Sequence, residues 1–415
     1  MEQKELIPHL FRNEYRKIVA VLCKTFGIAH MEVAEDMVSD TFLLAAETWA
    51  IKGLPENPTA WLYHVAKNKA LNYLKRDNLF HQKIAKQIVP EEEATEAIEI
   101  DLSPKHIEDS QLQMMFAVCH PAIGQEAQVG LSLRILCGFG IEEIADAFLT
   151  NKETINKRLF RAKEKLRTDK VKIEMPGPAK INERLATVLT TLYLLFNEGY
   201  YSLSQNIQLR KDLCLEAMRL TLLLLGNSLT DQPRVNALLA LMCFHASRFE
   251  SRTNVAGDTI LYEEQDEQTW NQELIAQGKH YLTRAATGDT LTRYHLEASI
   301  AYWHTFKQED NGKWQNILLL YNHLLIIEYT PIAALNRTFA LAKVKGKQAA
   351  IEEAEKLQLT GNHLYHTLLG ELYRDIDDVT SQQHLRKALT LAKTTADKQI
   401  ISRKIAEQET AKKPV

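Results

Sequence analysis

Apolar residues recur every three or four positions along most of this chain, which is the spacing that lines one face of an α-helix. Glycine and proline, which interrupt helices, number only 16 and 11 among 415 residues. The pattern therefore predicts an all-α protein. Its length and its 45% hydrophobic content suffice for two or three packed helical domains.

The sharpest local pattern is a pair of short helices between residues 140 and 167. In the first helix, Ile141 and Ile144 fall on one apolar face. Thr150 followed by Glu153 then has the spacing of a capping box, which predicts that a second helix begins there. The predicted buried stripe of this second helix consists of Ile155, Leu159, Ala162 and Leu166.

The second helix of the pair is strongly basic. Nine lysines and arginines and three acids lie between residues 152 and 172, a local balance of +6 in a chain whose total is −3. In a helix-turn-helix, the start of the second helix reaches base edges and later residues meet phosphates. The base-edge candidates are Lys152, Glu153, Thr154, Asn156 and Lys157, and the phosphate candidates are Arg158, Arg161 and Lys165. The alternative is a solvated basic helix that ends a bundle.

Two further amphipathic helices are predicted before residue 86. The first carries acids along the side opposite its apolar stripe, a pattern that most often marks a solvent-exposed helix face. Its apolar stripe consists of Val38, Phe42, Ala45 and Trp49, and its acids are Glu35, Asp36, Asp40 and Glu47.

The second of these helices follows a turn at residues 53–58 and has an amide-rich, basic side. Amides, cations and nearby rings suit melted DNA, because phosphates attract cations and unstacked bases stack on rings; the rings here are Trp61, Tyr63 and Tyr73. Taken alone, a polar helix face is more often plain surface. The inward positions are Leu62, Ala66, Ala70 and Tyr73, and the opposite side carries His64, Asn68, Lys69, Asn72, Lys75 and Arg76.

Two interruptions divide the chain. Residues 87–110 contain eight acids and one lysine, and they are predicted to form an exposed acidic linker. Residues 175–178, Met-Pro-Gly-Pro, are a second break because proline disfavours helix at itself and at the preceding residue. The predicted segments are 1–86, 87–110, 111–174 and 179–415.

The composition argues against several other classes of protein. Five scattered cysteines form no CxxC pair and no zinc-like cluster with histidine, which favours a reducing, cytoplasmic setting. The sequence contains no phosphate-binding loop or hydrolase motif, so no enzyme activity, cofactor or metal is expected. The most apolar stretch, residues 185–225, is broken by polar and charged residues, so no membrane-spanning helix is expected.

The C-terminal half shows weak self-similarity. Helix pairs recur from Trp314 onward at roughly 31–34 residues, close to the tetratricopeptide period, and Ala354 and Ala388 fall at matching places. Such pairs stack into a curved solenoid. Gly199 is expected to end a helix, since glycine is the usual stop. A group of aromatic residues at helical spacing is expected to be core rather than a ligand groove: Tyr294, Tyr302, Trp303, Trp314 and Tyr321.

Three motifs, in this order, resemble bacterial RNA polymerase sigma factors of the sigma-70 family, extracytoplasmic-function type. They are AEDMVSDTFLLAAETW from residue 34, NPTAWLYHVAKNKALNYLKR from residue 57 and LRILCGFGIEEIADAFLTNKETINKRLFRAKEKLR from residue 133. The resemblance covers residues 1 to about 172. The remainder resembles the tetratricopeptide-like helical extension that one subgroup of these factors carries.

The resemblance implies a role for each segment. Segment 1–86 would be sigma region 2, and segment 111–174 would be region 4, whose basic helix reads the minus-35 element. Core polymerase would be contacted through its β′ coiled coil and β flap, and the 87–110 linker would run through its channels. The implied polymerase contacts are Glu35, Asp36, Asp40 and Phe42, and the implied minus-ten contacts are His64, Asn68, Lys69, Asn72, Lys75 and Arg76.

For the extension, 179–415, the resemblance implies control of activity in cis rather than by a membrane-bound partner. A small YCII-like protein, or another ligand, is the partner that the subgroup suggests. Two alternatives remain open. One is a helix-turn-helix repressor whose repeats form a protein-binding scaffold, and such a repressor has no need of the two helices before residue 86. The other is an enzyme with an unfamiliar site in the extension.

Overall fold

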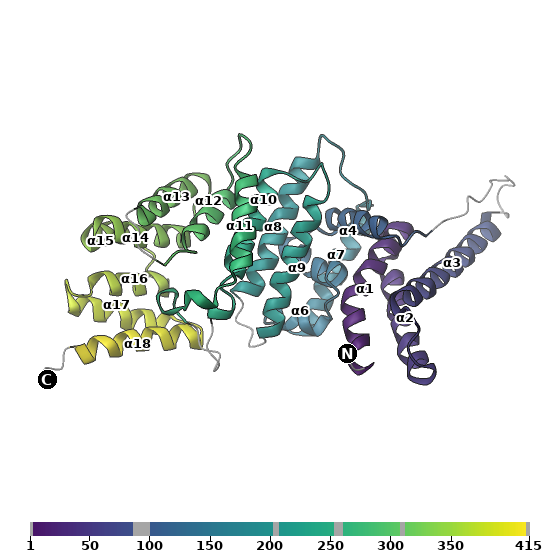
Figure 1. Cartoon of the computed structure of the whole chain (residues 1–415), viewed down its shortest axis with the longest axis horizontal. Coiled ribbons are helices and arrows are strands. Elements are labelled where there is room, and N and C mark those ends of the chain that lie inside the picture. Colours follow the sequence, from purple (N-terminus) through teal and green to yellow (C-terminus); the bar gives the residue numbers. More distant parts are fainter. Residues whose placement is uncertain (1–2, 86–99, 202–206, 253–259, 308–311, 412–415) are drawn as a thin grey trace. The chain divides into compact units, whose positions relative to one another are not determined.

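The computed structural model describes residues 3–85, 100–201, 207–252, 260–307 and 312–411. Within these ranges the chain consists of α-helices with a few short 3-10 and π turns and contains no strand, which confirms the all-α fold (Figure 1). The contacts divide it into two compact units, Met1–Thr230 and Asp231–Val415. Each unit has its own packed helices and is described by itself.

Unit 1 begins with α1 packed against α2 and α4. Its core includes Ile18, Leu22 and Met114, whose side chains are fully buried. Gly53 ends α2 with a positive φ of 80°, a conformation that glycine adopts at low cost. The helices of this unit are α1 Gln3–Phe26, α2 Met31–Lys52, α3 Pro58–Ala85, α4 Pro104–Val118, α5 Gln125–Leu131, α6 Ile141–Ala147, α7 Lys152–Thr168, α8 Ile181–Tyr200 and α9 Ile207–Leu225, with a 3-10 turn, η1, at Ile28–His30.

The boundaries of unit 1 differ from the predicted segments. Helix α4 begins at Pro104, inside the predicted linker 87–110, and residues 86–99 of that linker lie outside the described residues. Helices α8 and α9, which the sequence assigned to the extension, belong to the same compact unit as α1–α7. They pack against α4, α5 and α6, because their apolar faces complete the core of unit 1.

The helix-turn-helix forms where the sequence places it. Helices α6 and α7 pack together, and all four positions of the predicted stripe on α7 are at most 4% exposed. The cap differs from the prediction by one residue: Asn151, not Thr150, caps α7, and its side chain accepts a hydrogen bond of 2.8 Å from the backbone N–H of Thr154.

A π-helical turn, η2 (Ser132–Leu136), directly follows α5 and was not predicted. The backbone N–H of Cys137 donates to the carbonyl of Ser132, five residues earlier, which widens the helix by one residue. Such turns often lie at functional positions. In this chain the turn carries Arg134.

Helix α8 ends at Tyr200, so residues 197–200 form a helix C-terminus as the sequence suggested, although Gly199 itself is still helical, one residue before that end. A Cβ at this position would lie 2.6 Å from the backbone oxygen of Arg210 and 2.7 Å from the sulfur of Cys214. Glycine therefore allows α8 and α9 to approach closely.

Unit 2 consists of helices that each pack on their neighbours in the chain (Figure 1). Ala354 and Ala388, at matching places in the sequence, are both fully buried. Trp303, Trp314 and Tyr321 pack against one cluster of the core, as the sequence predicted. The helices are α10 Pro233–Ala246, α11 Gln272–Ala285, α12 Arg293–Trp303, α13 Lys313–Ile327, α14 Pro331–Lys345, α15 Lys347–Lys356, α16 His363–Tyr373, α17 Asp378–Leu391 and α18 Thr395–Ala411, with 3-10 turns at Glu250–Arg252, Tyr262–Glu264 and Glu267–Thr269.

All five cysteines are buried free thiols. Across the described ranges, no helix combines the length and the apolar character that a membrane crossing requires. The same ranges contain no group of three or more histidine, cysteine or acidic side chains arranged to hold a metal ion.

Candidate nucleic-acid interface

Helix α3 presents the polar face that the sequence predicted. Leu62, Ala66 and Ala70 are fully buried on one side of the helix. On the other side, five of the six candidate residues are exposed: His64, Asn68, Asn72, Lys75 and Arg76. This face carries amide and cationic groups, which are suited to single-stranded nucleic acid.

Contacts with neighbouring helices hold the rings of α3 in place. Trp61 packs edge-on against Trp49 of α2, with ring centroids 5.4 Å apart. The hydroxyl of Tyr63 donates a 2.6 Å hydrogen bond to Glu14 of α1. Both rings are half-buried, so they support the polar face from the side rather than standing free for base stacking.

The sixth candidate residue of α3, Lys69, is half-buried and reaches toward α2. Its Nζ lies 3.8 Å from a carboxylate oxygen of Asp40. Asp40 is exposed, so this ion pair contributes at most about 1 kcal/mol to stability. The pair joins α3 to α2.

Helix α7 exposes most of its candidate DNA-binding residues. Lys152, Glu153, Thr154, Asn156, Lys157, Arg161 and Lys165 are all exposed. Several already have acidic neighbours: Lys152 pairs with Glu142, Lys157 with Glu153 at 2.6 Å and Lys165 with Asp169 at 3.0 Å. These pairs lie at the surface, where an ion pair contributes little to stability.

Arg158 is held differently from the other basic residues of α7. Its side chain is 24% exposed, pairs with Glu126 of α5 at 2.7 Å and lies 5.3 Å from the ring centre of Phe148. Arg158 thus joins α7 to the rest of the helix-turn-helix. Arg161 is exposed and forms no ion pair among the described residues, so it is the freest of the three phosphate candidates.

The acidic helix α2 differs from the sequence prediction at two of its four candidate residues. Asp36 and Asp40 are exposed, as a docking surface requires. Phe42 is only 4% exposed and packs against Phe11 of α1 at 5.0 Å, so it supports α2 from within the core. Glu35 is only 5% exposed. Neither Glu35 nor Phe42 is available as a surface contact in this arrangement.

Glu35 lies between two cations from distant parts of the chain, Arg134 and Lys163. Its carboxylate accepts a 2.8 Å hydrogen bond from Nε of Arg134, in the η2 turn, and it pairs with Nζ of Lys163 on α7. Arg134 also donates to the backbone carbonyl of Phe139 at 3.2 Å. Since a buried carboxylate is costly unless paired, these two cations explain why Glu35 is tolerated there.

Two titratable groups, Tyr15 and Cys23, are fully buried close to Glu35. Burial, with the charge of Glu35 as a further cause, raises the pKa of the Tyr15 hydroxyl. The same two causes raise the pKa of the Cys23 thiol, while the charge of Lys163 opposes them. Both groups are therefore neutral near pH 7.

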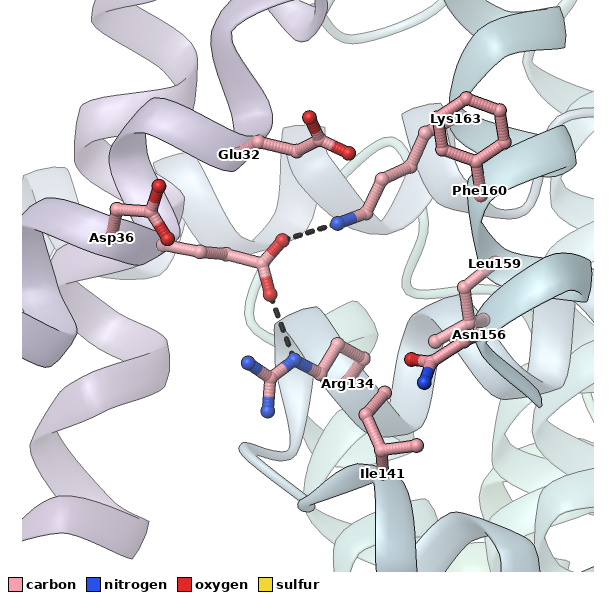
Figure 2. Close-up of a pocket in the computed structure, with 9 residues that line it drawn as sticks. Glu32, Asp36, Arg134, Ile141, Asn156, Leu159, Phe160 and Lys163 are labelled. Carbon is pink, nitrogen blue, oxygen red and sulfur yellow. Dashed lines mark hydrogen bonds and ion pairs between the residues drawn. The ribbon is translucent and has the colours of Figure 1, made fainter. Parts of the chain in front are cut away.

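A cleft of about 450 Å³ opens beside this ion-pair cluster (Figure 2). One wall comes from α2 and the other from α6, α7 and the η2 turn. Its lining residues are Glu32, Glu35, Asp36, Arg134, Ile141, Asn156, Leu159, Phe160 and Lys163. The cleft thus brings one candidate polymerase contact, Asp36, and one candidate base reader, Asn156, into the same space.

Helices α8 and α9 contact α1 on one side and the α5 and η2 elements, which lead into the helix-turn-helix, on the other. Glu216 of α9 pairs with the nearly buried Arg16 of α1, and Arg219 of α9 donates a 2.8 Å hydrogen bond to the backbone carbonyl of Leu136 in η2. On α8, Thr191 donates a 2.9 Å hydrogen bond to Gln128 of α5. These contacts could not be predicted from the sequence, because the partners lie far apart in the chain.

Comparison with known proteins adds two family matches. Residues 10–79 match sigma-70 region 2, and residues 184–286 match a family of unknown function, DUF6596. The first match covers most of α1, all of α2 and the exposed face of α3, and it supports a role for the chain as an RNA polymerase sigma factor in transcription initiation. The second begins in α8 and ends just after α11.

An uncharacterized protein of Rhizobium meliloti (strain 1021) is similar over most of its length. It is 30% identical over 351 residues, which cover 84% of this chain and 83% of that protein. No solved structure matches the chain.

Proposed function

The chain belongs to the same protein family as the uncharacterized Rhizobium meliloti protein, and from this premise and its sigma-70 region 2 we propose that it is a sigma factor of the extracytoplasmic-function type. In this proposal it binds core RNA polymerase in the cytoplasm, directs initiation at specific promoters and is controlled by its C-terminal helical extension. It catalyses no reaction of its own.

The observation that carries the proposal is the pairing of two different nucleic-acid surfaces in one unit. Helix α3, within the sigma-70 region 2 match, has an exposed amide and basic face, which suits a melted strand. Helix α7 is the basic second helix of a helix-turn-helix, which suits duplex DNA. A promoter offers both, a melted minus-ten element and a double-stranded minus-35 element.

The proposed contacts are the predicted residues of these two faces, most of which are exposed. On α3, His64, Asn68, Lys69, Asn72, Lys75 and Arg76 bind the minus-ten element. On α7, Lys152, Glu153, Thr154, Asn156 and Lys157 read bases of the minus-35 element, while Arg158, Arg161 and Lys165 bind phosphates. Asp36 and Asp40 contact the β′ coiled coil, and Glu35 and Phe42 join them only after rearrangement. The β flap is the partner proposed for the region 4 helices.

For the extension, we propose a tetratricopeptide-like scaffold in its later helices. Successive helices from α13 to α18 pack on one another, and Ala354 and Ala388 occupy equivalent buried positions. A small YCII-like protein or another ligand is the proposed partner of this scaffold.

The experiment is in vitro transcription with bacterial core polymerase on a library of promoter fragments, with and without the full chain. Defined start sites that appear only with the chain are expected. The competing function is a repressor with a protein-binding scaffold. Absence of initiation, together with binding of the chain to paired half-sites without polymerase, would favour the repressor instead.

A further inference from the structure

The two proposed DNA-binding surfaces lie close together in unit 1. Lys163 of α7 pairs with Glu35 of α2, and Asp40, five residues along the same helix, lies 3.8 Å from Lys69 of α3. Five residues of helix are about 7.5 Å long. Even if the DNA-binding stretches of α3 and α7 extended from this link in one straight line, their far ends would be at most about 60 Å apart.

The promoter elements that these surfaces are proposed to bind are farther apart. Positions minus-ten and minus-35 are separated by roughly 25 base pairs, or about 85 Å of B-form DNA at 3.4 Å per base pair. The arrangement of unit 1 therefore cannot hold both elements of one promoter at once. Because the promoter contacts are themselves proposed, the inference rests on the proposed function.

We infer that unit 1 is a closed state, latched by Glu35 between Arg134 and Lys163, which has to open before the chain engages a promoter. Glu35 comes from the region 2 part of the unit, whereas Arg134 and Lys163 come from the helix-turn-helix part. All three side chains are less than a quarter exposed. Loss of one partner leaves an uncompensated buried charge and weakens the closed state.

The cleft beside the latch indicates that the closed state prevents simultaneous binding of polymerase and duplex DNA. Asp36 and Asn156 line the same cleft, although one is proposed to contact polymerase and the other a base of the minus-35 element. Polymerase on α2 and duplex DNA on α7 would compete for this space. Opening of the latch separates the two surfaces, so that polymerase can bind α2 while duplex DNA binds α7.

Helix α9 holds the closed state from a second side. Its Glu216 pairs with Arg16 of α1, within the region 2 match, and its Arg219 binds the carbonyl of Leu136, in the turn that carries Arg134. A single helix of the segment matched by DUF6596 thus joins both halves of the closed state. This contact gives the extension a direct physical route to control in cis, within unit 1.

The test removes a positive charge and is expected to strengthen DNA binding, whereas the loss of a cation usually weakens it. Lys163→Gln removes the latch, and Lys172→Gln removes an equal charge from an exposed position just after α7. Neither residue belongs to the proposed contact sets. If only the open state binds, the apparent affinity rises in proportion to the open fraction. We expect Lys163→Gln to bind polymerase and promoter about tenfold more tightly, and Lys172→Gln to bind equally or less tightly.

A second readout does not depend on sigma-factor function. Cys23 is fully buried beside Glu35 and Lys163, so its rate of thiol labelling in the free chain reports how often this region opens. Lys163→Gln should speed the labelling of Cys23 about tenfold, while Lys172→Gln should not. Because the charge of Lys163 lowers the pKa of this thiol, its loss alone would slow labelling, so faster labelling reports opening.

The outcomes separate the latch from the proposed function. Arg134→Gln, which removes the other cation, should reproduce both effects of Lys163→Gln. Labelling that is equal in Lys163→Gln and the wild-type chain would overturn the latch. Faster labelling without tighter promoter binding would overturn its role in promoter engagement. If no variant supports transcription, the proposed function fails, and the labelling rates still decide whether the latch exists.

Discussion

Replacement of Arg161 by alanine tests the proposed minus-35 surface at its most accessible phosphate candidate. Arg161 is exposed on α7 and forms no ion pair among the described residues, so its loss leaves the fold and the acidic neighbours undisturbed. Arg158 is unsuitable for this test because it also pairs with Glu126. Arg167 provides a matched control, since it lies on the same helix and pairs with Glu164.

The magnitude follows from counterion release. Each phosphate neutralised by a cation contributes about 0.9 to the slope of log affinity against log salt concentration. Loss of the Arg161 contact should therefore lower the slope by about 0.9 and weaken binding about eightfold at 0.1 M salt. Between 50 and 200 mM salt, the wild-type complex should lose about 3.5-fold more affinity than the variant does.

The assay is the binding of a promoter fragment by core polymerase with the full chain, measured at five or more salt concentrations. Arg167→Ala should leave the slope near its wild-type value. Parallel lines for Arg161→Ala and the wild-type chain would refute the assignment of Arg161 to a phosphate.

Three further predictions concern single residues. Asn72→Ala should reduce promoter opening about tenfold without weakening polymerase binding, as measured by permanganate reactivity of the melted strand; an equal loss of polymerase binding would contradict the assignment. Gly278→Ala should lower the free energy of unfolding by about 1–3 kcal/mol in urea titrations, since the new Cβ would lie 2.5 Å from the ring of Phe244. The control Gly361→Ala should be nearly neutral, because a Cβ there meets nothing within 4 Å. Burial, with the nearby cations, lowers the pKa of His304 to about 3. Below about pH 6.5, His304 is therefore protonated in the unfolded chain while it stays neutral in the folded chain. His304 alone should therefore lower stability as the pH drops below about 6.5, by about 2 kcal/mol at pH 5, and His304→Asn should reduce the slope of stability against pH by that contribution.

Helical periodicity was enough to predict the local structure of the interface. The stripe on α7 that includes Ile155 and Leu166 is buried as expected, and the polar face of α3 is exposed as expected. These features depend on residues a few positions apart, which a sequence displays directly. The cap of α7 was wrong by one residue because Thr150 and Asn151 both have good capping side chains.

The burial of Glu35 was missed, although the sequence carried a signal for it. Glu35 lies four residues after Met31 and three before Val38, so it falls on the buried stripe of α2. An acid on an apolar stripe indicates a buried ion pair. Its partners could not be predicted, because Arg134 and Lys163 lie about 100 and 130 residues away and meet Glu35 only through tertiary packing.

The division of the chain was also beyond the sequence. Residues 175–178 read as a domain boundary, yet α8 and α9 complete unit 1 after that break. Proline and glycine report where a helix stops, but they do not report which core the next helix joins. The contact of Arg219 with the carbonyl of Leu136 spans 83 residues and has no local signature.

The most direct test of the central claim is a footprint of the full chain on a promoter identified by transcription, with and without core polymerase. A sigma factor should protect two elements roughly 25 base pairs apart, with melting at the downstream one, and only when polymerase is present. Two protected half-sites one helical turn apart, equally strong without polymerase, would contradict the account and identify a dimeric repressor instead.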